Sequence, residues 1–153
     1  MKKNGKLTRS YRIVRLAVHV LYAVAMAELL FPWIKTQLRL RLERRWSAGL
    51  MRILHIHVRV QGAAPGLETH NIMLVANHVS WLDIYLLSSV RPARFVSKSE
   101  VRSWPLVGRL AYRVGTFFID RARRHDTARV NHARSAALSK GGCVAVFPEG
   151  TTS

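Results

Sequence analysis

The sequence predicts a mixed α/β fold, with a partly parallel sheet flanked by helices and preceded by an N-terminal pair of membrane-associating helices. Three short, charge-poor segments have the apolar composition of buried strands. These segments are 72–76, 116–120 and 143–147. Apolar residues at helical spacing separate them, at 82–90, 105–113 and 126–140. Strands that alternate with helices along a chain are typical of α/β domains with parallel strands.

Two further strands are expected from shorter patterns. Residues 94–97 lie between two of the predicted helices, and residues 57–61 alternate between apolar and polar side chains. Residues 62–66, Gly-Ala-Ala-Pro-Gly, then form a turn or linker. The α/β domain is therefore expected to begin near residue 55.

Polar residues follow the three main strands at their carboxyl ends. His78 and Asp83 come after the first, Arg121 after the second, and Glu149 and Gly150 after the third. Carboxyl ends of strands are where ligand and catalytic groups gather in α/β proteins. A histidine there can accept a proton near pH 7, and a carboxylate can fix its tautomer. The alternative is a polar loop histidine beside an acid at a helix start.

Three blocks in this order resemble the glycerolipid acyltransferase family, and most of all its bacterial 1-acylglycerol-3-phosphate acyltransferases. They are Asn-His-x-x-x-x-Asp at 77–83, Gly-x-x-Phe-Ile-Asp-Arg at 115–121 and Phe-Pro-Glu-Gly-Thr at 147–151. The resemblance covers residues 55 to 153. It implies transfer of an acyl group from a thioester to the free hydroxyl of 1-acylglycerol-3-phosphate, which gives phosphatidic acid.

The same resemblance implies roles for individual residues. His78 would be the general base that removes the proton from the acceptor hydroxyl, and Asp83 would orient it. The implied substrate-binding residues are Lys98, Gly115, Arg121, Glu149, Gly150 and Thr151. Arg121 also begins a run of arginines, so a solvated surface is its alternative. Glu149 could equally be a loop carboxylate. No metal is expected, because the sequence has no CxxC motif or His/Cys cluster. No cofactor is expected either, because acyl-CoA or an acyl-carrier protein is a co-substrate.

The N-terminal 54 residues are predicted to form a two-helix hairpin inserted into one leaflet of a membrane. Residues 13–31 are nearly all apolar, and Pro32 interrupts them. From Ile34 to Leu54 an apolar residue recurs every four positions with arginines between, as in a basic interfacial helix. A single span, a cleaved signal peptide and a pair of ordinary core helices are the alternatives.

Charge points to an anionic partner. The chain has 25 Lys and Arg against 8 Asp and Glu, a net charge of +17, and residues 1–60 hold 13 of the basic groups and 2 of the acidic ones. An anionic membrane surface is favoured over nucleic acid, because the arginines alternate with apolar and aromatic residues. The other expected partners are the lyso-phospholipid acceptor and the thioester donor. The single Cys143 precludes an intramolecular disulfide, which is typical of a reduced compartment.

These expectations give a domain plan. Residues 1–54 form the membrane-associating hairpin, and residues 55–153 form the first part of an acyltransferase domain, because members of the resembled family continue further. The expected location is the inner (cytoplasmic) membrane, with the active site on the cytoplasmic side where thioester donors are found. A different lyso-lipid acceptor, a non-catalytic lipid-binding module and a basic nucleic-acid-binding domain are the alternatives.

Overall fold

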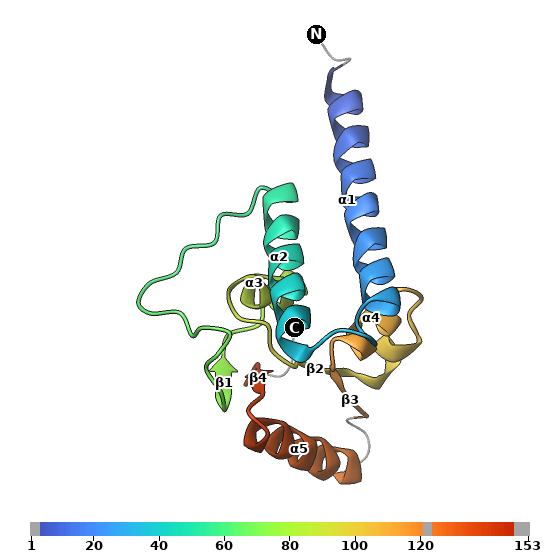
Figure 1. Ribbon diagram of the computed structural model, residues 1–153. Helices are drawn as coiled ribbons and strands as arrows, with labels where there is room; N and C mark the ends of the chain where they lie inside the picture. Colours follow the sequence, from blue (N-terminus) through green and yellow to red (C-terminus); the bar gives the residue numbers. More distant parts are fainter. Residues whose placement is uncertain (1–3, 121–123, 149–153) are drawn as a thin grey trace.

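The computed structural model describes residues 4–120 and 124–148 of the 153. Helices α1 (Asn4–Leu29) and α2 (Thr36–Ile53) form an N-terminal hairpin, and α1 projects beyond the end of α2 (Figure 1). The remaining elements are β1 (Ile72–Val75), α3 (Leu82–Val90), β2 (Val96–Lys98), the 3-10 helix η1 (Ser99–Ser103), α4 (Val107–Arg113), β3 (Phe117–Ile119), α5 (Arg124–Ser139) and β4 (Cys143–Val146). The predicted alternation of strands and helices is confirmed.

The strands form two parallel pairs, β1 with β4 and β2 with β3. The backbone of Arg94 joins the pairs, because its N–H donates to Cys143 O and its carbonyl accepts from Ala145 N, both at 2.9 Å. The strands therefore follow the order β1-β4-β2-β3 and all run the same way. Their carboxyl ends share one edge of the sheet, and their amino ends share the other.

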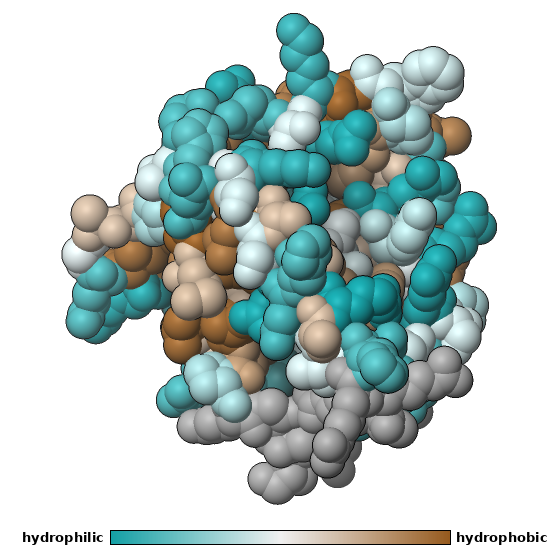
Figure 2. Space-filling model, turned by 90° about the horizontal axis from the view of Figure 1, so that it is seen from below, coloured by the Kyte–Doolittle hydropathy of each residue, from teal (hydrophilic) through white to brown (hydrophobic). Residues whose placement is uncertain are grey.

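Helices cover the sheet from two sides. Helices α2 and α3 lie on one side and α5 on the other (Figure 1). Strand β1 ends the sheet, and its residues alternate, with Ile72 and Leu74 half-buried and Met73 and Val75 exposed. From below, the surface is mostly hydrophilic, and its apolar side chains gather toward one side (Figure 2).

A reciprocal contact between His19 and Trp46 fastens α1 to α2. Trp46 Nε1 donates to the His19 carbonyl at 2.9 Å, and His19 Nε2 lies 3.0 Å from the Trp46 carbonyl. The two rings stack with centroids 4.9 Å apart. Gly49 makes this approach possible, since a Cβ there would lie 2.9 Å from the imidazole Cε1 of His19. The hairpin is thus held by side chains near its middle.

Most of the apolar stripe of α2 packs against protein, although Leu38 is exposed. Trp46 and Leu50 are buried in a cluster with residues of α1, and Trp46 meets the ring of Tyr85 in α3 edge-on. A four-residue repeat produces the same stripe whether protein or membrane covers it, and here α3 supplies the covering surface. The exposed large apolar side chains of the hairpin lie mainly on α1 and at the turn. They are Tyr11, Ile13, Val14, Val18, Leu21, Tyr22, Leu29, Leu30, Trp33 and Leu38.

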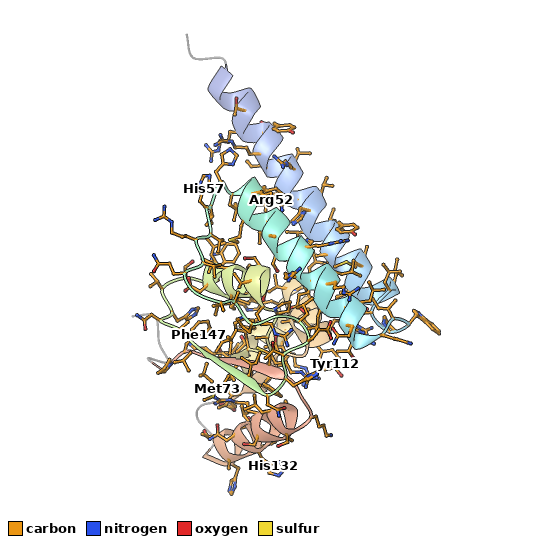
Figure 3. All side chains as sticks on the ribbon, turned by 60° about the vertical axis from the view of Figure 1, so that its left-hand side comes forward. Arg52, His57, Met73, Tyr112, His132 and Phe147 are labelled. Atoms are coloured by element: carbon orange, nitrogen blue, oxygen red, sulfur yellow. The ribbon has the colours of Figure 1, made fainter. Side chains whose placement is uncertain are left out.

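None of the described helices combines the length and the apolarity that a bilayer crossing requires. The strand predicted at 57–61 is wrong, because these residues form no strand. Val58 packs against the α1–α2 cluster, while His57 is exposed beside the end of α2 (Figure 3) and Val60 is exposed as well.

Candidate active site

The turn between β1 and α3 brings His78 and Asp83 together. His78 follows the carboxyl end of β1, and Asp83 lies in the first turn of α3. His78 Nδ1 is 3.1 Å from Asp83 Oδ2, and their side chains are 24% and 26% exposed. The pair is therefore partly shielded from water but open to a ligand at the edge of the sheet.

Backbone donors fix the carboxylate of Asp83. The N–H groups of Val79 and Ser80 both donate to Oδ2 at 2.8 Å. Burial acts to raise the pKa of Asp83, but the N–H groups of Ser80 and Val79 and the His78 ring together outweigh it and hold the pKa below its usual value. Asp83 is thus an anion at neutral pH, pre-positioned toward the imidazole.

The geometry selects the nitrogen that can act as a base. The neutral tautomer that donates from Nδ1 to Asp83 leaves the lone pair on Nε2 of His78. A carboxylate on Nδ1 also stabilises the imidazolium that forms once Nε2 has taken a proton. A histidine held in this way is suited to deprotonating a hydroxyl that approaches the carboxyl edge of the sheet.

Phe147 completes the support of His78, and the sequence patterns did not indicate it. It follows β4, and its ring stacks on the imidazole with centroids 4.2 Å apart and planes 21° apart. Stacking restricts rotation of the imidazole about its side-chain bonds. A local sequence signal accompanies the Ser80 contact, because Ser-x-x-Asp at 80–83 resembles a capping box, in which the acid accepts from the N–H of the serine.

The other predicted site residues are distributed unevenly. Lys98 is exposed at the end of β2 and so lies at the same edge of the sheet as His78. Gly115 precedes β3 and lies at the opposite, amino edge of the sheet. A Cβ atom added to Gly115 would lie 3.3 Å from Nε of Arg94. The structure does not bring Gly115 together with the His78–Asp83 pair. Its φ of +84° favours glycine for a conformational reason. The remaining predicted residues, Arg121, Glu149, Gly150 and Thr151, lie outside the described part.

Within residues 4–120 and 124–148, no group of three or more His, Cys, Asp or Glu side chains is placed to hold a metal ion.

The chain is similar to known proteins in sequence and in structure. The sequence profile of the Acyltransferase family matches residues 57–153. The chain is 47% identical over 117 residues to the lyso-ornithine lipid O-acyltransferase of Pseudomonas aeruginosa, covering 76% of this chain and 44% of that protein. It is 40% identical over 105 residues to the 1-acyl-sn-glycerol-3-phosphate acyltransferase of Neisseria meningitidis, covering 69% and 41%.

A solved structure shares the fold. The crystal structure of the 1-acyl-sn-glycerophosphate acyltransferase PlsC from Thermotoga maritima superposes with a TM-score of 0.62 at 24% identity, over 93% of this chain and 64% of that one. The chain spans less than half the length of the two curated relatives. The profile match over most of the chain and the identity to these relatives lead to one conclusion: this chain belongs to the Acyltransferase family.

Proposed function

We propose that this chain transfers a fatty acyl group from a thioester donor, acyl-CoA or acyl-carrier protein, to the free hydroxyl of a lyso-lipid. The observation that carries the proposal is the His78–Asp83 contact of 3.1 Å at the carboxyl edge of a parallel sheet. Membership of the family supports the reaction class.

The reaction follows from the position of the two side chains. His78 Nε2 takes the proton of the acceptor hydroxyl while its oxygen attacks the thioester carbonyl carbon. The tetrahedral intermediate then expels the thiolate, the C–S bond breaks, and the imidazolium returns the proton to sulfur. Asp83 stabilises that imidazolium. A positioned base contributes on the order of 10²- to 10⁴-fold in rate.

The acceptor we propose first is 1-acylglycerol-3-phosphate, which gives phosphatidic acid. The exposed ammonium of Lys98 at the same edge supports an anionic acceptor, and the Neisseria relative carries this activity in its name. For substrate binding we also retain Arg121, Glu149, Gly150 and Thr151. A lyso-ornithine lipid is the second candidate, because the relative at 47% identity is named for that acceptor.

We further propose that the protein works at the cytoplasmic face of the inner membrane. Exposed apolar residues at helical spacing on α1, among them Tyr11, Val14, Val18 and Tyr22, support contact with lipid. The net charge of +17 supports an anionic surface. A membrane-bound enzyme meets an insoluble acceptor and a soluble thioester at one interface.

The test is release of free thiol from acyl-CoA by the purified chain, with a panel of lyso-lipids. Thiol release that depends on lysophosphatidic acid supports the first acceptor, and release that depends on lyso-ornithine lipid supports the second. Acyl-acyl-carrier protein in a parallel assay identifies the donor. Lipid binding without thiol release for any acceptor or donor would contradict the enzymatic proposal and indicate a binding module.

A further inference from the structure

A cavity of about 480 Å³ lies at the amino edge of the sheet, opposite the edge that carries His78. Its lining includes residues that lie one or two positions before the four strands: His70, Arg94, Gly115 and Gly142. Residues at the start of α2, among them Gln37 and Arg39, line another side. We call this space the amino-edge cavity. Its volume is in the range of small-molecule sites, roughly 300–1,000 Å³.

Arg91 is a buried cation in the lining of the amino-edge cavity. It ends α3 and is 3% exposed. Its Nη2 donates to the Thr69 carbonyl at 2.9 Å, and the guanidinium also interacts with the Cys143 thiol, whereas Nε and Nη1 make no well-formed hydrogen bond within the described residues. A buried guanidinium with unused donors is costly unless an acceptor reaches it. Nε and Nη1 of Arg91 can therefore donate hydrogen bonds to a ligand at the wall of the cavity.

The other charged groups around the cavity are mostly positive. The cavity is also lined by Arg39, Arg94, Arg113 and Lys140. Of these, Arg113 forms an ion pair with Glu28, whose carboxylate also pairs with Arg109. The acid in the described lining is Glu43, and burial raises its pKa to about 8 against the opposing effect of Arg91. Its carboxyl is therefore largely neutral at pH 7, and the cavity keeps a net positive charge.

We propose that the amino-edge cavity binds a phosphate-bearing small molecule, with Arg91 as its buried anchor, at a site separate from the catalytic edge. A phosphate offers several acceptor oxygens in different directions, which suits cations arranged around a cavity. Strands of four residues at roughly 3.3 Å per residue separate the two edges by about 13 Å. A ligand at Arg91 therefore does not touch His78, and the proposal does not depend on the acyl-transfer reaction.

Calorimetric titration of the whole chain with inorganic phosphate, at constant ionic strength against chloride, tests the proposal. Wild type is expected to bind saturably with one phosphate per chain. Arg91→Gln removes the anchor and is expected to weaken binding about 10- to 100-fold, the usual effect of losing a hydrogen bond to a charged group. Lys140 is an exposed residue of the lining, so Lys140→Gln is expected to weaken binding by a smaller factor. This variant provides the test if Arg91→Gln does not fold.

Two variants locate the bound phosphate. Arg59→Gln removes an equal charge from an exposed residue outside the cavity and should leave the affinity unchanged. Lys98→Gln should also leave it unchanged, whereas phosphate held at the catalytic edge would lose a cation by that change. No saturable binding to wild type, or equal weakening by Arg59→Gln and Lys140→Gln, would overturn the proposal.

The single cysteine gives a second readout. Cys143 lines the cavity and is otherwise buried, so occupancy should slow its alkylation by iodoacetamide several-fold in wild type but not in Arg91→Gln. Glycerol 3-phosphate in one arm and phosphatidate vesicles in another distinguish a soluble phosphate ester from a lipid headgroup. If neither the two esters nor inorganic phosphate slows the alkylation of Cys143, the proposed phosphate site is contradicted.

Discussion

At the scale of single residues, the candidate site depends on how one turn presents Asp83. The same Oδ2 atom accepts from the N–H groups of Val79 and Ser80 and contacts His78 Nδ1. One carboxylate therefore both stabilises the start of α3 and orients the imidazole. Replacing Asp83 is therefore expected to lower both the stability of the chain and its turnover. The pH dependence of each property distinguishes the two effects.

The stability that Asp83 contributes should depend on pH in a defined direction. Its pKa is lower in the folded chain than its usual value of about 3.9. The stabilisation is therefore complete well above pH 4 and is lost as the pH falls through the folded-state pKa. Asp83→Asn does not titrate, so the difference in unfolding free energy between wild type and variant should shrink from pH 6 to pH 2. Urea denaturation across that range measures it, and a difference independent of pH would contradict the account.

The His78–Asp83 contact could be predicted from sequence because it is local. Asp83 lies five positions after His78, and Ser80 and Asp83 together indicate the start of a helix. The stacking of Phe147 on His78 could not be predicted in the same way. The two residues are far apart in sequence, and only the parallel pairing of β1 with β4 brings them together.

At the scale of elements, the hairpin shows what amphipathicity can and cannot predict. The break at Pro32 and the four-residue repeat predicted two helices, and α1 and α2 are present. The repeat could not predict which surface covers the apolar stripe, because protein and lipid are both apolar partners. The ring contact of Trp46 with Tyr85 shows that α3 covers part of the stripe of α2.

Packing of the hairpin should make the effects of two substitutions non-additive. Alanine is favoured over glycine inside a helix by about 1 kcal/mol. In wild type, Gly49→Ala should fall short of this gain, because the new Cβ displaces the His19 ring from the Trp46 carbonyl. In a His19→Ala background the full gain should appear. Unfolding free energies of the four proteins give the coupling, and strictly additive effects would show that the close approach has no energetic consequence.

At the scale of the whole molecule, function depends on which edge of the sheet a residue occupies. The sequence order of strands and helices predicted a shared carboxyl edge, and the parallel pairing confirms it. The predicted strand at 116–120 already placed Gly115 before its strand, and the structure puts it at the amino edge, away from the residues with which the resemblance groups it. No local sequence pattern indicates the backbone bridge between Arg94 and Val144, because tertiary packing decides which strands lie side by side.

Membrane binding should depend on α1. Val14→Ser, Val18→Ser and Leu21→Ser together remove exposed apolar side chains at helical spacing and leave the buried residues of α1 intact. Loss of this apolar area should weaken binding to anionic vesicles by roughly tenfold or more. Co-sedimentation with phosphatidylglycerol-containing vesicles measures it.

A matched control uses apolar residues of similar exposure elsewhere. Val60→Ser, Met73→Ser and Val75→Ser together remove three such side chains outside α1 and should leave vesicle binding unchanged. Equal weakening by both triple variants would assign the effect to general hydrophobicity instead of α1.

The most direct measurement is thiol release from acyl-CoA by His78→Ala beside His132→Ala. His132 is an exposed histidine on the far side of α5 (Figure 3). His78→Ala should lower turnover on the order of 10²- to 10⁴-fold while vesicle binding persists, and His132→Ala should match wild type. Wild-type turnover in His78→Ala would contradict the assignment of His78 as the general base.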